Sequence, residues 1–381
     1  MKNSFKVLLW VRSDCFKAKG GDMIQVENTF IELKKLGLDV VISDKNNVDL
    51  SDFDIVHLFQ LDWTPETYLH AKKAHKIGKK IILSPIHHSV SEVKKFDDEY
   101  VFGLRRLSKY LFVDQFQRDT FKNIYRSILD RSKALPTLYS VFLGLKNMNR
   151  KVISWSDYVL TQTKIEAEDL SNTYDVNFKW EIVPNGVGEL FLEKKKYQNL
   201  FNFDNYILCV GRIEPRKNNL AIISAVKLLR KELNKDIKLV FVGKTSSKHF
   251  EYTKLFLEEL KENKWVHYNN YLAYEQIPSI YKYAKVCVSA SWFETTGLTL
   301  LEALFMGANA VSTSPRAREI LGDFCSYCEP NDLESIKEAI KTEYFKPKPK
   351  LPSDFKNEYT WENTAKKTLK IYNDLMKDYQ K

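Results

Sequence analysis

Basic residues gather in the segment from Gly211 to Asn219, at a place where an anion could bind. A predicted strand ends at Gly211, and Arg212 and Lys217 follow it before the next helix begins. A guanidinium offers paired donors to phosphate oxygens, and an ammonium adds a compact charge. The segment therefore fits the diphosphate of a leaving group, and a solvated basic turn is the alternative interpretation.

Two glutamates, Glu294 and Glu302, form a second candidate group. Glu294 lies in a loop after a predicted strand, and Glu302 lies about one turn inside the helix that follows. The start of this helix near Gly297 adds backbone amides that lack partners within the helix. We expect both carboxylates to face one cleft. The alternative chemistry is a pair of general acid and base carboxylates.

The sequence around Gly21 gives a weaker signal. Gly20 and Gly21 follow the first predicted strand and open its helix, so the backbone can approach an anion closely. The alternative is a flexible loop in which Asp22 caps the helix.

Metal binding is not expected from the sequence. Asp52 and Asp54 imitate a D-x-D metal site but lead into a predicted strand, and Cys325 and Cys328 have no second pair or histidines nearby. The five cysteines are odd in number and widely scattered, which favours reduced thiols and a cytoplasmic protein.

Apolar runs alternate with helical patterns through nearly the whole chain, which is typical of parallel sheets with crossover helices. The fold class is therefore α/β, with two series of six strands and a terminal helix over 361–381. A polar stretch over 193–205 separates the two series. The expected strands are 6–11, 39–42, 55–59, 80–86, 158–162 and 180–183 in the first series, and 206–210, 238–242, 265–268, 286–289, 308–312 and 326–328 in the second.

The composition is that of a globular protein. Of 381 residues, 44% are hydrophobic and 28% are charged, which excludes disordered, collagen-like and coiled-coil proteins. The length favours two domains. No apolar run reaches the length of about 18 residues that a membrane-spanning helix needs.

The net charge of +10 is concentrated in one segment, because residues 103–151 hold eleven Lys and Arg against three Asp. Aromatic and aliphatic residues alternate with these charges, and the pattern predicts two or more helices inserted between strands. One interpretation is a surface that rests on an anionic membrane or contacts a lipid-linked acceptor, through residues 101–151. The other is an amphipathic helix packed on the first domain with a basic outer face. We expect no nucleic-acid partner, because no nucleic-acid reading motif accompanies the charge.

Taken together, these motifs resemble those of the retaining glycosyltransferases of family 4, which have the GT-B architecture. Arg212 and Lys217 match the G-R-x4-K diphosphate site of that family, and Glu294 and Glu302 match its E-x7-E motif. Residues 183–187 match its V-P-N-G-V turn. The order and spacing agree over nearly the whole chain.

The resemblance implies a role for each matching residue. Arg212 and Lys217 would bind the donor diphosphate, Glu302 would hold the ribose hydroxyls, and Glu294 would hold the donor sugar. A histidine after the fourth strand would lie beside the reacting sugar carbon, and either His87 or His88 fits, with His87 favoured. Further donor-binding residues would be Gly21, Tyr271, Thr295, Thr296, Gly297 and Leu298.

Some positions depart from the pattern of the family. The glycine usual before the residue at Tyr271 is Asn270 here, and residues 295–297 replace the usual G-F-G turn. We therefore expect a donor-sugar pocket that differs from that of typical relatives.

The resemblance also implies a domain plan. Two Rossmann-like domains would face each other across a cleft. Residues 1–190 would bind the acceptor and carry the basic helical insertion at about 92–150, and residues 191–360 would bind the nucleotide sugar. The helix over 361–381 would return to the first domain.

The implied activity is transfer of a hexose from a nucleoside diphosphate sugar to an acceptor hydroxyl, with retention of anomeric configuration and with no metal or other cofactor. The acceptor would be a glycan or a lipid-linked molecule in polysaccharide, lipopolysaccharide or glycolipid synthesis. Such a protein would work in the cytoplasm or at the inner face of the cell membrane. A non-catalytic protein that binds sugar nucleotides or membranes is an alternative on the same fold. A glycan phosphorylase is another, and it would need a lysine that carries pyridoxal phosphate.

Overall fold

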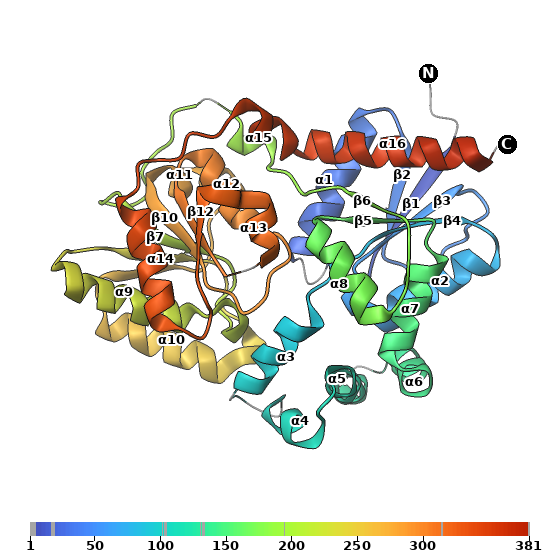
Figure 1. The fold of residues 1–381 in the computed structure, drawn as a ribbon, viewed down its shortest axis with the longest axis horizontal. Helices are drawn as coiled ribbons and strands as arrows, with labels where there is room; N and C mark the ends of the chain where they lie inside the picture. Colours follow the sequence, from blue (N-terminus) through green and yellow to red (C-terminus); the bar gives the residue numbers. More distant parts are fainter. Residues whose placement is uncertain are drawn as a thin grey trace. The chain divides into compact units, whose positions relative to one another are not determined.

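A computed structural model describes residues 5–16, 20–100, 102, 105–129, 131, 134–193, 195–313 and 315–379 (Figure 1). The chain divides into two compact units. Unit 1 contains residues 1–91, 107–186 and 359–381, and unit 2 contains residues 92–106 and 187–358. In this division residues 92–106, which follow β4 in the sequence, lie in unit 2.

Unit 1 is built on a six-stranded parallel sheet with the order β2-β1-β3-β4-β5-β6. The β4 strand ends two residues before the predicted end, because Pro85 offers no amide and Ile86 has a positive φ of 43°. The other strands of this sheet match the expected ranges within a residue. The strands are β1 (Lys6–Trp10), β2 (Asp39–Ser43), β3 (Ile55–Phe59), β4 (Lys80–Ser84), β5 (Tyr158–Thr161) and β6 (Trp180–Ile182).

Helices cover both faces of this sheet (Figure 1). Val7 and Leu9 of β1 pack in one apolar cluster with residues of α1 (Gly21–Lys35) and α16 (Trp361–Tyr379). Leu8 points to the opposite face, in a cluster with α2 (Thr64–Lys76), α7 (Leu145–Trp155) and α8 (Lys164–Tyr174). Both faces are buried, as parallel strands require.

The predicted terminal helix is confirmed, and it returns to unit 1. Helix α16 packs against α1, and the Thr364 hydroxyl donates to the carbonyl of Pro184 at 2.7 Å. A Cβ atom on Gly186 would lie 2.1 Å from the carbonyl carbon of Thr360. The V-P-N-G-V turn therefore needs glycine at this position because the backbone before α16 crosses directly over it.

Unit 2 has a second six-stranded parallel sheet, with the order β12-β11-β10-β7-β8-β9. One face packs against α9, α10 and α14, and α11 and α12 contact strands of the same sheet. All six predicted strands are present. The elements are β7 (Tyr206–Val210), α9 (Asn219–Leu233), β8 (Leu239–Val242), α10 (Phe250–Glu262), β9 (Val266–Asn269), α11 (Ile277–Tyr283), β10 (Ala284–Ser289), α12 (Leu298–Met306), β11 (Asn309–Ser312), α13 (Pro315–Leu321), β12 (Cys325–Tyr327), α14 (Leu333–Phe345) and α15 (Ser353–Glu358).

The inserted segment after β4 is helical, as predicted. Most of α3 (Val90–Glu99) packs on unit 2, where Phe96 contacts the rings of Trp292 and Phe293. The helices α4 (Arg105–Leu111), α5 (Gln115–Leu129) and α6 (Ala134–Leu143) follow. In the described part of the chain, no helix is both long and apolar enough to cross a membrane.

Candidate functional site

In unit 2 the predicted anion-binding segment lies in a sharp turn at the carboxyl end of β7. Gly211 and Gly243 both have φ 144°, and a Cβ atom on Gly243 would lie 2.1 Å from the carbonyl oxygen of Gly211. The loops after β7 and β8 therefore touch backbone to backbone, as only glycine allows. A single turn of 3-10 helix (Pro215–Lys217) follows, and it presents Arg216 and Lys217 at the edge of the sheet.

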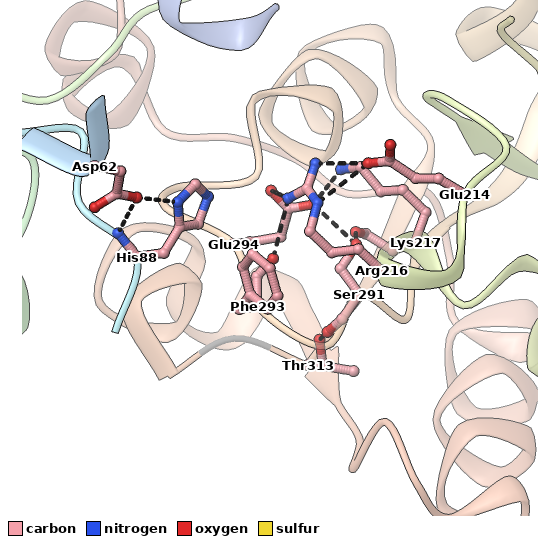
Figure 2. A network of polar contacts seen from close by, with 10 residues as sticks. Asp62, His88, Glu214, Arg216, Lys217, Ser291, Phe293, Glu294 and Thr313 are labelled. Carbon is pink, nitrogen blue, oxygen red and sulfur yellow. Dashed lines mark hydrogen bonds and ion pairs between the residues drawn. The ribbon is translucent and has the colours of Figure 1, made fainter. Parts of the chain in front are cut away.

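Lys217 meets Glu294 in this turn. Its ammonium forms an ion pair with Oε1 of Glu294, and the hydroxyl of Ser291 donates to the same oxygen at 2.8 Å (Figure 2). Nη1 of Arg216 lies 3.8 Å from Oε2 of Glu294. The structure thus brings the predicted diphosphate ligand Lys217 and the predicted sugar ligand Glu294 into direct contact.

Arg216 joins the two loops, and the sequence analysis did not select it. Its Nη2 lies 3.1 Å from Glu214, and its Nη1 donates to the carbonyl of Phe293 at 3.3 Å. Its own carbonyl accepts from the amide of Trp292 at 2.9 Å. In the sequence, only its position beside Lys217 pointed to Arg216, because the G-R-x4-K motif does not specify the residue at this position.

The neighbouring cations lower the pKa values of Glu294 and Glu214. Burial opposes the ionisation of Glu294, but Lys217 and Arg216 outweigh it and lower the pKa of Glu294 to about 2. Burial likewise opposes ionisation of Glu214, and Arg216 together with Arg212 lowers its pKa. Both carboxylates are therefore ionised at neutral pH.

Arg212 differs from its neighbours because it is exposed and makes no hydrogen bond or ion pair with any residue that the structure describes. Its guanidinium still influences Glu214 electrostatically. Five donors on one planar group are therefore open to an anion at this end of β7.

Glu302 occupies a different environment. It lies on α12, which begins after Gly297 in a left-handed conformation (φ 68°). Burial raises the pKa of Glu302 to about 7, although the Tyr281 hydroxyl donates to its Oε2 at 3.0 Å and opposes the rise. The first amides of α12 lie in the turn formed by residues 295–298, at the positive end of the helix.

An aromatic residue near Glu302 was missed. Tyr271 is 64% exposed, and its ring lies under the ammonium of Lys244 at 5.8 Å. Tyr274 interacts electrostatically with Glu302, because burial and the charge of Glu302 together raise the pKa of Tyr274 to about 12. The ring of Tyr274 also contacts Phe191. The spacing of the motif identified Tyr271, whereas only the fold relates Tyr274 to the carboxylate.

Unit 1 carries the two histidines, and one carboxylate holds both. Asp62 lies 2.6 Å from Nδ1 of His87. It also lies 2.6 Å from Nδ1 of His88 and accepts from the His88 amide at 3.2 Å (Figure 2). Burial opposes the ionisation of Asp62, but the two histidines lower its pKa. Side-chain exposure is 3% for His87 and 24% for His88, so His88 is the more accessible group.

The backbone around the histidines is strained. Ile86 has φ 43° directly before His87, and Gln60 at the end of the neighbouring strand β3 has φ 69°. Such conformations are costly for side chains other than glycine and are held by their surroundings. Here the His87 amide donates to the buried carboxylate of Glu166 at 3.0 Å, and the Gln60 amide donates to the carbonyl of Ser84 at 2.9 Å.

Gly21 opens α1, and a Cβ atom placed on it would meet nothing within 4 Å. The alternative role of Asp22 as a helix cap does not occur, because Gly20 is the N-cap residue and Asp22 accepts from Nε of Arg12 at 2.8 Å. Arg12 is almost fully buried and also pairs with Asp14.

The described part of the chain holds no group of three or more His, Cys, Asp or Glu side chains arranged to hold a metal ion. Asp54 instead accepts from the backbone amide of Lys6 at 2.8 Å, and so fixes the start of β1.

Comparison with known proteins places most of unit 2 in one family. Residues 191–358 match the family described as "Glycosyl transferases group 1". The chain is 29% identical over 161 residues to O-antigen chain mannosyltransferase B of Escherichia coli, covering 42% of each protein. It is 29% identical over 230 residues to an N-acetylgalactosaminyltransferase of Campylobacter jejuni that acts on N-acetylgalactosamine-N,N'-diacetylbacillosaminyl-diphospho-undecaprenol, covering 58% of this chain and 60% of that one. The chain thus spans about half the length of the curated relatives it matches.

Solved structures share the fold over nearly the whole chain. Sucrose-phosphate synthase from Thermosynechococcus elongatus aligns with a TM-score of 0.70 at 15% identity, covering 98% of this chain and all of that one. HepE from Anabaena in complex with UDP aligns with a TM-score of 0.65 at 10% identity, covering 97% of this chain and all of that one. These likenesses identify the fold as GT-B, as expected from the sequence. Residues 191–358 thus match the glycosyl transferases group 1, and the chain as a whole has the fold of GT-B glycosyltransferases.

Proposed function

We propose that the protein is a retaining glycosyltransferase that moves a hexose from a nucleoside diphosphate sugar to an acceptor hydroxyl. The observation that carries the proposal is the pairing of Lys217 with Glu294 at the carboxyl edge of the second sheet. This edge is where parallel α/β sheets bind their ligands. The pair combines Lys217, which can bind a phosphate, with Glu294, which can accept a hydrogen bond from a sugar hydroxyl.

Unit 2 would bind the donor. Arg212 and Lys217 would bind the diphosphate, and Glu302 would accept hydrogen bonds from the ribose hydroxyls. The backbone of the turn before α12 would contact the phosphate and the sugar, because helix N-termini favour anions. The proposed donor-binding residues of unit 2 are Arg212, Lys217, Tyr271, Thr295, Thr296, Gly297, Leu298 and Glu302, and Gly21 of unit 1 would approach the diphosphate.

The chemical step would break the bond between the anomeric carbon and the diphosphate oxygen, which keeps the electron pair. The acceptor oxygen would form the new bond to that carbon, and its proton would pass to the leaving diphosphate. Lys217 and Arg212 would stabilise the negative charge that develops on the diphosphate oxygen. Glu294 would hold the sugar through a hydroxyl once the ammonium of Lys217 turns to the phosphate. We infer that the diphosphate needs no metal ion, since these cations and the α12 amides would neutralise its charge.

A histidine of unit 1 would act beside the reacting carbon. We propose His88 for this role, because its ring is accessible and Asp62 fixes its orientation through Nδ1. Asp62 would also stabilise positive charge near the anomeric carbon at low cost, since it is already ionised. His87, which is buried against Tyr174, would support the loop.

Unit 1 would bind the acceptor, and the printed activities of the relatives suggest its class. The E. coli relative is named for mannosyl transfer to O-antigen, and the C. jejuni relative for transfer to a sugar on diphospho-undecaprenol. We propose a glycan or lipid-linked acceptor in glycoconjugate synthesis, used in the cytoplasm at the inner face of the cell membrane.

A thermal-shift panel tests the donor site. UDP, GDP, ADP and their hexose conjugates would be tested on the wild type, on Glu302→Ala and on Glu262→Ala, which removes an exposed glutamate of α10 as a control. Ligands that bind the native state raise its Tm. We expect one nucleotide series to stabilise the wild type and the control but not Glu302→Ala. No shift with any nucleotide would contradict the donor site.

Turnover is then tested with the stabilising sugar nucleotide, with and without lipid-linked and free glycan acceptors. We expect release of the nucleoside diphosphate and a product that keeps the anomeric configuration. Binding without transfer or hydrolysis would support the non-catalytic alternative.

A further inference from the structure

Helix α6 of unit 1 exposes several large apolar residues. In a surface helix of a globular protein the apolar stripe faces the core. In α6 the buried residues include Thr137 and Ser140, which are 6% and 1% exposed. Tyr139 and Leu143 pack on the apolar core of unit 1. Four other large apolar residues face outward, with exposures of 61% for Leu135, 52% for Leu138, 49% for Val141 and 80% for Phe142.

The outward residues form one face. Positions 135, 138, 141 and 142 lie within roughly 120° around a helix with 3.6 residues per turn. The opposite side is fixed to the protein, because α6 packs against α2, α5 and α7 and the Thr137 hydroxyl donates to the Asn123 carbonyl at 3.5 Å. In Figure 1, α6 lies outside α7, away from the strands of unit 1. The exposed apolar face is thus a fixed part of the fold.

Exposed apolar residues are also frequent in the helices that precede α6. Of the 27 large hydrophobic residues that are exposed in the described chain, eleven lie between Leu107 and Phe142. An exposed apolar face such as that of α6 marks an interaction surface. Residues 101, 103, 104, 130, 132 and 133 of the basic segment lie outside the described residues.

Beside the exposed face, α2, α6 and α7 enclose a groove of about 550 Å³. Its apolar wall is made by Leu138, Phe142 and Trp155, and lysines of α2 and α7 line its edge, namely Lys72, Lys76 and Lys151. The ammonium of Lys72 lies 5.0 Å from the ring centre of Tyr139. The groove therefore offers apolar contacts and positive charge together.

We propose that α6 and this groove dock the protein on an anionic lipid bilayer. Leu135, Leu138 and Phe142 enter the interface, and Lys72, Lys76 and Lys151 bind lipid phosphates. Amphipathic helices bind membranes in this way, by apolar burial combined with attraction to anionic headgroups. The excess of Lys and Arg over 103–151 favours lipid over a second copy of the chain, since two such faces would repel each other.

Flotation with vesicles tests the proposal independently of any transferase activity. Phosphatidylcholine vesicles containing about one third phosphatidylglycerol are compared with pure phosphatidylcholine. We expect the full chain to float with the anionic vesicles, to float at least ten-fold less with neutral ones, and to bind more weakly as salt rises.

Two variants locate the surface. Leu138→Gln combined with Phe142→Gln is expected to reduce binding about ten-fold or more, whereas the matched control Phe250→Gln, on α10 and 75% exposed, is expected to leave it unchanged. Lys72→Ala combined with Lys76→Ala is expected to reduce it about five-fold per lysine, and Lys227→Ala on α9 not at all. The Tm of each variant is measured to confirm folding.

Three results would overturn the proposal. They are failure of the wild type to float with anionic vesicles at low salt, equal binding by the α6 variant and the control, and concentration-dependent dimers that the α6 variant abolishes in the absence of lipid binding. The last result would show that the exposed face of α6 is an interface with a second copy of the chain.

Discussion

The two units hold their candidate site residues by opposite electrostatic arrangements. In unit 2 one carboxylate, Glu294, is surrounded by cations and a hydroxyl that come from two loops. In unit 1 one carboxylate, Asp62, serves two imidazoles on a single strained loop. The first arrangement places Lys217 and Arg216 where an anion could bind. The second holds the rings of His87 and His88 in fixed orientations. The difference agrees with the roles proposed above, in which the cations of unit 2 bind the leaving diphosphate and His88 of unit 1 lies beside the reacting carbon.

The largest effect is expected from the cation of unit 2. Lys217→Ala removes one preorganised contact to the leaving diphosphate, and turnover should fall by about two orders of magnitude or more. Steady-state kinetics with the sugar nucleotide identified above measures it, with Lys227→Ala as the control. Near wild-type turnover would remove Lys217 from the proposed mechanism.

The second effect concerns the carboxylate of unit 1. Asp62→Asn keeps the size of the side chain but removes the charge that orients both histidines, and turnover should fall roughly ten-fold to hundred-fold. Asp39→Asn, on the exposed edge strand β2, is the control.

Comparison of the histidine variants sharpens this test. His88→Ala should lower turnover with little change in Tm, because His88 is the accessible ring. His87→Ala should lower Tm, because its buried ring packs against Tyr174. The reverse pattern would assign the sugar-facing role to His87, as the sequence alone favoured.

The asymmetry between the units also explains what could be read from the sequence. The motif residues of unit 2 lie within short segments whose spacing is preserved in the chain, so Arg212, Lys217, Glu294 and Glu302 could be selected together. Asp62 could not, because it precedes His87 by 25 residues and meets it only where the loops after β3 and β4 adjoin in the sheet.

The strands could be predicted because parallel strands buried on both faces form continuous apolar runs. The placement of residues 92–106 could not, since an amphipathic pattern shows that an apolar face exists but not which unit covers it. Contacts such as that between Phe102 and Tyr252 decide it, and they join residues far apart in the sequence. For the same reason the outward face of α6 was not distinguishable from a packed one.

A third, smaller effect should appear in the pH dependence of donor binding. Burial raises the pKa of Glu302 to about 7, and ribose hydroxyls donate to the ionised form. Binding below this pH must therefore release a proton, and affinity should fall up to about ten-fold per pH unit as pH drops from 7. Calorimetry with a sugar nucleotide is suitable, because its diphosphate lacks the terminal phosphate ionisation that lies near pH 6.

Stability gives an independent check on this carboxyl group. Because the folded-state pKa is raised from 4.5, the folded protein holds its proton more tightly than the unfolded chain does, so stability should fall as pH rises from about 4.5 to about 7. Glu302→Gln should lack this decline and should bind donor weakly without a pH slope. A wild type with constant affinity across this range would contradict the role of Glu302.

The smallest effect should come from the hydroxyl that supports the unit 2 network. Ser291→Ala removes the 2.8 Å hydrogen bond to Glu294 but leaves the ion pair with Lys217. A single such bond contributes about 1 kcal/mol, so donor affinity should fall about five-fold while Glu294 stays ionised at neutral pH. Ser224→Ala, which removes a hydroxyl bonded within α9, is the control. An effect as large as that of Lys217→Ala would mean that donor binding depends on the orientation of Glu294 more than on the positive charge of Lys217 and Arg216. Both units would then act mainly by fixing the orientation of site side chains.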